Sequence, residues 1–173
     1  MKAGLRFIII FLLFTLLGGT AVGLTDIGKV CVFSAISGVV TLNGQPVAHA
    51  KLVRTASKER EHQDETTTDE NGYFSFPAMY ERSIAKFLPM EFVAKQKIMI
   101  EHNGKSYKLW SGVKGKPDEN VEARGKPLIV ECQLNNDISH IWVNGLVFST
   151  LCKWDVEPDP PVNMDKVFES DLE

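Results

Sequence analysis

The chain has 173 residues, of which 44% are hydrophobic and 24% are charged, with 19 Lys and Arg residues against 22 Asp and Glu residues. These proportions are typical of one globular domain and exclude a chain that is disordered throughout. The net charge of −3 argues against a general nucleic-acid binder, because such proteins need a clustered basic surface. Three cysteines are too few for a small protein stabilised chiefly by disulfides.

Residues 1–23 have the pattern of a secretory signal helix. Lys2 and Arg6 precede a long apolar run, and Gly18-Gly19 with the small residues that follow provides a cleavage-like exit. The alternative is an uncleaved membrane anchor, since residues 7–25 carry no charge and are about long enough to span a bilayer. Both interpretations place the rest of the chain outside the cytoplasm. The protein is then periplasmic or secreted in the first case, and anchored in the inner membrane in the second.

Charge is distributed unevenly along the remaining chain. Without residues 1–23 there are 17 basic and 22 acidic residues, and six of the acidic ones lie in residues 157–173 with only Lys166 to offset them. That segment begins Glu-Pro-Asp-Pro-Pro, which is incompatible with a helix or a central strand. We therefore expect a charge-balanced domain over residues 24–156 and an acidic, proline-rich flexible tail over residues 157–173.

The central part of the chain has the pattern of an all-β protein. Segments rich in β-branched and aromatic residues alternate with turn sequences, and Asn-Gly pairs at 43–44, 103–104 and 144–145 each predict a tight hairpin. The expected strands cover residues 30–42, 50–55, 66–68, 73–76, 92–101, 105–111, 128–134, 138–143 and 146–154. We interpret residues 56–65 as a solvated turn region and residues 112–125 as a charged loop, while the segment 80–91 is compatible with a short helix. About seven to nine short strands with little helix predict a β-sandwich.

Three segments resemble the carboxypeptidase regulatory-like domain. They are Ile-Ser-Gly-Val-Val at 36–40, a Gly-Gln-Pro turn within 43–53, and a Thr-rich strand that leads through Asp-Glu-Asn-Gly into Tyr-Phe-Ser-Phe at 66–76. The resemblance covers about residues 34–78 and implies a transthyretin-like (prealbumin-like) β-sandwich. It places these residues in the core: Val40, Val47, Leu52, Phe74 and Phe76. Domains of this kind are usually accessory modules, so the resemblance implies no activity of its own.

The second half of the chain departs from such a short module. Residues 82–91, 98–110 and 125–132 look like an uncharacterised family of exported bacterial proteins, a domain of unknown function, which brings no mechanism with it.

Recognisable catalytic and metal-binding motifs are missing from the sequence. The four histidines, at positions 49, 62, 102 and 140, do not have zinc-ligand spacing, and we expect no metal and no cofactor. There is no Gly-x-Ser-x-Gly motif, and the motifs of 5-hydroxyisourate hydrolases, the one enzyme class that we associate with the transthyretin-like fold, are absent. Cys152 lies beside Lys153, but an exported cysteine is more often oxidised than nucleophilic. We therefore expect a protein without catalytic residues, that is, one that is not an enzyme.

The cysteines predict one disulfide. Export favours its formation, and three cysteines leave one thiol unpaired. We expect the pair Cys132–Cys152 because both residues lie in late, neighbouring strands, and pairs that involve Cys31 are the alternatives. An unstrained disulfide that closes the loop between Cys132 and Cys152 stabilises the fold by about 3 kcal/mol.

These observations lead to the hypothesis of a non-enzymatic, exported β-sandwich that recognises another protein in the bacterial cell envelope. One concrete version is an immunity or inhibitor protein against a secreted toxin. The alternatives are an accessory module that binds carbohydrate or peptidoglycan, and a membrane-anchored structural spacer. The candidate binding residues are Tyr107, Trp110, His140 and Trp142, because aromatic side chains commonly form such contacts. We expect no nucleic-acid partner, and a membrane contact only through residues 1–23.

Overall fold

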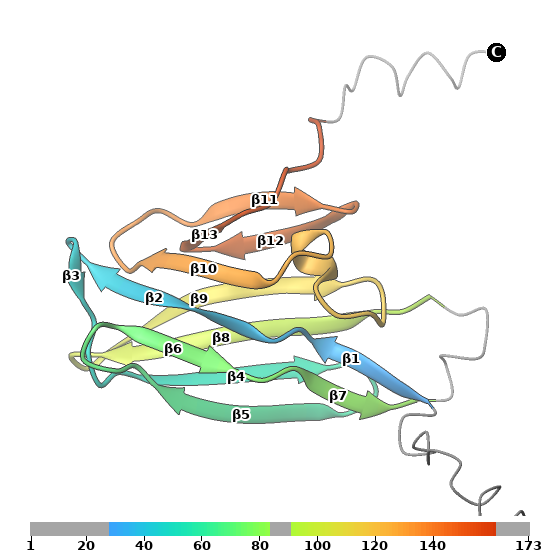
Figure 1. The fold of residues 1–173 in the computed structure, drawn as a ribbon, viewed down its shortest axis with the longest axis horizontal. Helices are drawn as coiled ribbons and strands as arrows, with labels where there is room; N and C mark the ends of the chain where they lie inside the picture. The colour runs from blue at the N-terminus through green and yellow to red at the C-terminus, as the bar shows by residue number, and fades with distance from the viewer. Residues whose placement is uncertain (1–27, 84–90, 162–173) are drawn as a thin grey trace, which may run out of the picture.

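The computed structural model describes residues 28–83 and 91–161, which form an all-β structure (Figure 1). The expected signal or anchor helix at residues 1–23 lies outside the described residues. In chain order the elements are β1 (Lys29–Phe33), β2 (Ile36–Leu42), β3 (Gln45–Pro46), β4 (Lys51–Ser57), β5 (Glu61–Thr67), β6 (Tyr73–Phe76), β7 (Met79–Arg82), β8 (Ala94–His102), β9 (Lys105–Lys114), the 3-10 turn η3 (Val121–Ala123), β10 (Leu128–Gln133), β11 (Ser139–Val143), β12 (Leu146–Thr150) and β13 (Cys152–Trp154). Within the two described stretches, no helix has the length and apolar character needed to cross a membrane.

Six antiparallel strands form one sheet, in the order β11-β12-β9-β8-β4-β5. A second sheet has the order β13-β10-β2-β3, with β6 also paired to β2, and β1 pairs with β7 beside it. Within this second sheet, β10 and β2 run parallel to each other. Side chains from both sheets meet in one hydrophobic core, as in a β-sandwich. The five core residues expected from the resemblance are all buried.

All three Asn-Gly pairs form the hairpin turns that the sequence predicts. Both residues of each pair have a positive φ, as at Asn144 (55°) and Gly145 (77°), which a type I′ turn requires. These turns join β2 to β3, β8 to β9 and β11 to β12. Local sequence therefore determines three of the connections in the molecule.

The structure corrects the sequence prediction at residues 56–65. This segment holds most of β5, an edge strand whose side chains are exposed or half-buried at every position. Neither face of the strand is apolar, so the alternation of hydrophobic and polar residues that identifies a strand is missing. The segment is nevertheless a strand, because it pairs with β4 over seven residue pairs.

Two expected strands are each divided in two. The strand at residues 30–42 is interrupted at Ser34, whose backbone N–H and hydroxyl both donate to Glu122. The strand at residues 146–154 is interrupted at Leu151, whose N–H donates to the carbonyl oxygen of Leu109. Of the segment 80–91, residues 80–82 lie in β7, and residues 84–90 lie outside the described residues.

Gly38 lies where β2 and β10 approach closely. A Cβ atom at this position would lie 1.9 Å from the carbonyl oxygen of Val130. We expect Gly38→Ala to lower the free energy of unfolding by about 1–3 kcal/mol, because backbone atoms cannot give way without disturbing the parallel pairing. Urea denaturation followed by tryptophan fluorescence measures the loss. Gly104→Ala is the control. A Cβ atom at this position meets open space, so the substitution lowers the free energy of unfolding only through the positive φ of residue 104. A loss at Gly38 no larger than that at Gly104 would contradict the clash.

Candidate functional site

The outer face of the six-stranded sheet carries two rows of side chains that cross all six strands. Residues that face each other in neighbouring antiparallel strands project to the same side of the sheet, so the register defines the rows. From β11 to β5, the first row consists of His140, Ser149, Ser111, Lys97, Thr55 and Gln63. The second row consists of Trp142, Val147, Val113, Lys95, Ser57 and Glu61, where Val147 and Val113 each lie one position beyond the paired residues Phe148 and Gly112.

A groove with a volume of about 560 Å³ runs along these rows. Four hydroxyl side chains line it, contributed by β4, β9 and β12: Thr55, Ser57, Ser111 and Ser149. Val113 and Val147 add apolar surface between them.

Two positively charged side chains, those of Lys95 and Lys97, lie in the middle of the groove. Lys95 and Lys97 are exposed on β8, and neither forms an ion pair with any residue in the described ranges 28–83 and 91–161. Their neighbours in the two rows are uncharged serine, threonine and valine residues. Elsewhere on the same sheet, by contrast, Lys51 lies 2.6 Å from Glu65. The centre of the groove is therefore electropositive.

Trp142 and His140 lie on β11, next to the lining residues Val147 and Ser149, although they do not themselves line the groove. The Trp142 side chain is 52% exposed and faces Val147, which lines the groove. The Nδ1 atom of His140 lies 2.9 Å from the hydroxyl oxygen of Ser149, another lining residue. The structure thus brings together two of the four predicted binding residues.

The other two predicted binding residues lie on the core side of β9. Trp110 is fully buried, with its ring centroid 5.0 Å from that of Phe148, and Tyr107 is half-buried against the core. The register shifts in this part of β9, where Leu109 and Trp110 are both buried. An irregularity of this kind breaks the alternation on which sequence reasoning depends, and it excludes Trp110 from any exposed aromatic face.

The strand that carries the two lysines is fixed from its inner face. Gln96 lies between them in sequence and points into the core, where its amide nitrogen donates to the carbonyl oxygen of Val32 at 3.0 Å and to Oε1 of Glu122 at 2.8 Å. The indole nitrogen of Trp110 donates to Oε1 of Gln96 at 3.3 Å. The positions of Lys95 and Lys97 on the outer face are therefore set by polar contacts below the sheet.

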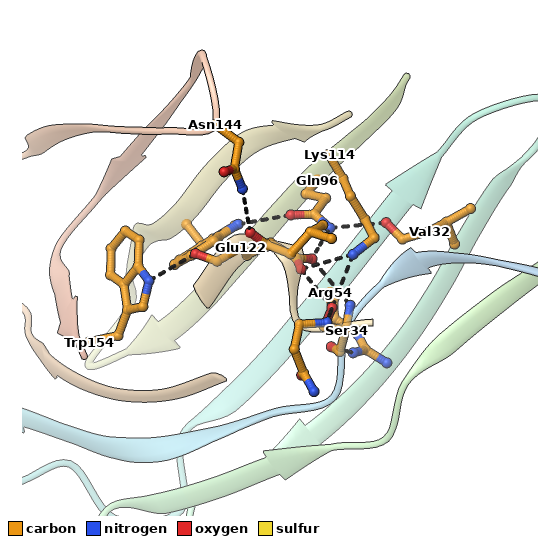
Figure 2. A network of polar contacts seen from close by, with 11 residues as sticks. Val32, Ser34, Arg54, Gln96, Lys114, Glu122, Asn144 and Trp154 are labelled. Atoms are coloured by element: carbon orange, nitrogen blue, oxygen red, sulfur yellow. Dashed lines mark hydrogen bonds and ion pairs between the residues drawn. The ribbon is translucent and has the colours of Figure 1, made fainter. Parts of the chain in front are cut away.

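Glu122 is the centre of this buried polar cluster, on which Gln96, Lys114 and Ser34 converge (Figure 2). Lys114 Nζ lies 2.9 Å from Oε2 of Glu122, and both side chains are completely buried. The Ser34 hydroxyl donates to the same oxygen at 2.6 Å. Burial favours the neutral carboxyl group, but the charge of Lys114 and the donated hydrogen bonds outweigh it and hold the pKa of Glu122 below its usual value.

The contact of Lys114 with Ser34, at 3.1 Å, has the composition of a nucleophile beside a base. The side chains of Lys114 and Glu122 are completely buried and pair with each other, and Ser34 is itself buried. The contacts instead hold the loop before β10: Asn120 N–H donates to Ser34 Oγ, and Trp154 Nε1 donates to the Glu122 carbonyl oxygen. The sequence prediction missed this cluster because charged residues in a loop normally lie in solvent.

Comparison of the sequence with known protein families shows the family to which the chain belongs. A family model described as Domain of unknown function (DUF6795) matches residues 36–137. The chain belongs to this family. The DUF6795 region runs from the start of β2 to the turn before β11, so it includes Lys95, Lys97 and the buried cluster except Ser34 and Trp154. The hairpin with His140 and Trp142 follows it. No curated protein matches the chain.

A disulfide links the DUF6795 region to the segment that follows it. Cys132 and Cys152 are joined, which confirms the predicted pair, and they face each other in the pairing of β10 with β13. Cys152 consequently presents no thiolate. Within the described part of the chain, no group of three or more His, Cys, Asp or Glu side chains is arranged to hold a metal ion.

Cys31 carries the remaining thiol, which is buried beside the cluster. Burial raises the pKa of this thiol to about 11, against the opposing effect of the Lys114 charge. We therefore expect no alkylation of the folded, unreduced protein by iodoacetamide at pH 8, because reaction requires an exposed thiolate. Mass spectrometry should find one modified cysteine only after unfolding in urea. Rapid modification of the native protein would contradict this burial.

The first residues of the acidic tail lie against the β11–β12 turn. The carboxylate of Asp159 accepts hydrogen bonds from the backbone N–H groups of Gly145 at 2.7 Å and Asn144 at 3.1 Å, and it pairs with Arg124. These contacts hold the pKa of Asp159 below its usual value, with the Gly145 N–H as the largest cause. Residues 162–173 lie outside the described residues.

Proposed function

We propose that this chain is a non-enzymatic recognition module that binds another protein in the bacterial cell envelope, outside the cytoplasm. The observation that carries the proposal is the outer edge of β11, which Asp159 of the same chain contacts at Trp142 and which is open at His140. The N–H of Asp159 donates to the carbonyl oxygen of Trp142 at 2.8 Å, so the backbone groups of Trp142 point away from β12. Those of His140, two residues earlier, point the same way and have no hydrogen-bond partner in the described ranges.

The sequence of β11 makes this edge suitable for pairing with another chain. The strand reads Ser-His-Ile-Trp-Val and carries no carboxylate, Lys or Arg. Ile138, just before it, is 47% exposed, and Trp142 is 52% exposed. The opposite edge of the same sheet, β5, carries Glu61, Asp64 and Glu65. Charged edge strands resist the addition of a further strand, whereas an uncharged, apolar edge favours it. The partner we propose is therefore a protein that adds an extended, apolar segment beside β11.

Further support for the proposal comes from the sequence and from the buried cluster. The signal-like pattern of residues 1–23 supports a location in the envelope, and the burial of Ser34 and Lys114 supports a non-catalytic role. The turn and strand pattern of residues 36–76 supports a transthyretin-like sandwich as the finer fold. The concrete version of the function remains an immunity or inhibitor protein for a secreted toxin.

Photocrosslinking tests the proposed edge contact. A photoreactive phenylalanine analogue placed at Ile138 is expected to give a discrete adduct in cells that normally make the protein, and mass spectrometry identifies the partner. The same analogue at Tyr73, which is 45% exposed on the other sheet, is the matched control and should give no such adduct.

Two substitutions at one position then separate strand pairing from side-chain contact. His140→Pro removes the outward N–H that a partner strand needs and should abolish the adduct at position 138. His140→Ala keeps that N–H and should preserve it. Loss of the adduct in both variants, or in neither, would refute pairing at this edge.

A further inference from the structure

We propose that the groove on the outer face of the six-stranded sheet binds an anionic oligosaccharide, a chain of sugar rings that carries carboxylate groups. This site lies on the face of the sheet, whereas a partner strand would pair with the backbone edge of β11; Trp142 adjoins both, and the ligand of the groove does not require the protein partner proposed above. The inference rests on three observations: the charge of the groove, its hydrogen-bonding groups and the aromatic side chains beside it.

The charge of the groove indicates an anionic ligand. Lys95 and Lys97 project side by side from β8 and form no ion pair within residues 28–83 and 91–161. Glu61 is the one negatively charged side chain among the described residues that line the groove, and it lies at the end of the groove, on the edge strand β5. Two cations that lie together among uncharged neighbours repel each other, and a ligand with carboxylate groups relieves that repulsion.

The polar lining indicates a ligand rich in hydroxyl groups. Thr55 and Ser57 flank the lysines on one side, and Ser111 and Ser149 lie on the other. Each hydroxyl group both donates and accepts hydrogen bonds, which matches the dual character of the hydroxyl groups of a sugar. An acidic peptide would use the lysines but would leave most of these hydroxyl groups to water.

The aromatic side chains beside the groove supply an apolar platform. The exposed Trp142 ring stands beside Val147, and His140 stands beside Ser149 in the next row. The faces of sugar rings carry C–H groups that pack on an aromatic surface, while their edges present hydroxyl groups. A ring stacked on Trp142 therefore directs the rest of the oligosaccharide along the groove toward Lys97 and Lys95.

The dimensions of the groove fit an oligosaccharide. Its volume of about 560 Å³ falls within the range of about 300–1,000 Å³ that ligand sites have. Adjacent strands lie about 4.8 Å apart, so the rows from β11 to β5 extend over about 24 Å, which exceeds the width of one sugar ring. Lys95 and Lys97 lie in the middle of that length.

Isothermal titration calorimetry of the whole mature protein at low salt tests the site with three probes. They are a hexamer of galacturonic acid, a neutral hexamer of galactose, and hexaglutamate. We expect binding of the acidic sugar, with an affinity about tenfold or more above that of the other two probes. Raising the salt concentration should weaken this binding, because exposed charges are screened.

Matched variants assign the binding to the groove. Trp142→Ala and the double variant Lys95→Gln/Lys97→Gln should each weaken binding of the acidic hexamer about tenfold. Tyr73→Ala and Lys153→Gln, on the other sheet, should leave it unchanged. Thermal unfolding of each variant controls for loss of the fold.

Several results would overturn the inference. Equal affinity for hexaglutamate, with no effect of Trp142→Ala, would show that charge alone is recognised. Equal affinity for the neutral hexamer would remove the role of the lysines, and binding of none of the probes would remove the site. These outcomes are distinguishable from failure of the edge contact, because His140→Pro affects crosslinking at position 138 and leaves Lys95 and Lys97 in place.

Discussion

Replacing Glu122 by leucine, or Lys114 by methionine, is expected to lower the free energy of unfolding by about 3–5 kcal/mol. Each substitution removes one member of a completely buried ion pair and leaves the charge of the other without a partner. Glu122→Leu also removes the acceptor for Ser34 and Gln96. Urea denaturation at pH 7, followed by tryptophan fluorescence, measures the loss.

The double variant Lys114→Met/Glu122→Leu is the control. It removes both charges together, so its loss should be clearly smaller than the sum of the two single losses, and the double-mutant cycle gives the coupling between the side chains. Additive losses would mean that the pair contributes only through the volume of its side chains.

The same pair predicts a dependence of stability on pH. The folded state lowers the pKa of Glu122, so its stabilising contribution is complete above the pKa of the unfolded state, about 4.3, and is lost as the pH falls through the folded value. Stability of the natural protein should therefore decline below about pH 4.3. The double variant should show a shallower decline, and a decline of equal steepness would contradict this role of Glu122.

Replacing both Cys132 and Cys152 by alanine is expected to lower the free energy of unfolding by about 3 kcal/mol. The disulfide joins residues 20 positions apart, and without it the unfolded chain gains the freedom of an open loop. It also joins β13 to β10, so the short strand β13 loses its covalent attachment to the sheet. Comparison of urea denaturation midpoints and slopes for the two proteins checks this value.

Cys31→Ala is the matched control for the disulfide. This residue is buried, but its thiol is free, so its replacement leaves the covalent link intact and should cost less. A reducing agent should destabilise the natural protein and the Cys31→Ala variant by similar amounts. It should have no effect on the variant that lacks Cys132 and Cys152.

The features of the fold that depend on short stretches of sequence were predictable. Local sequence patterns that are compatible with few other structures account for the Asn-Gly turns, the strand at Tyr73–Phe76 and the burial of Val40 and Leu52. The disulfide also followed, because two late strands are natural neighbours. β5 did not, because a polar edge strand takes its structure from pairing with β4 and not from an apolar face of its own.

The candidate groove was predictable only in part. His140 and Trp142 could be selected as aromatic residues in a late strand, but their proximity to Lys95 and Lys97 depends on the order of strands in the sheet. β11 and β8 are separated by β12 and β9, and no local pattern specifies that order. The cluster at Glu122 was hidden for the same reason, since Ser34 lies 88 residues away in sequence.

The parallel pairing of β2 with β10 has a consequence for the order of folding. β4, β5, β8 and β9 are antiparallel neighbours that can assemble once the chain has been made as far as Lys114. β2 must wait for Leu128–Gln133, because its parallel partner lies about ninety residues further along. Closing so long a loop is slow, so the second sheet should form last and limit the folding rate. During that interval β2 is paired with β3 and β6 on one side only, and its other edge is exposed and vulnerable to aggregation.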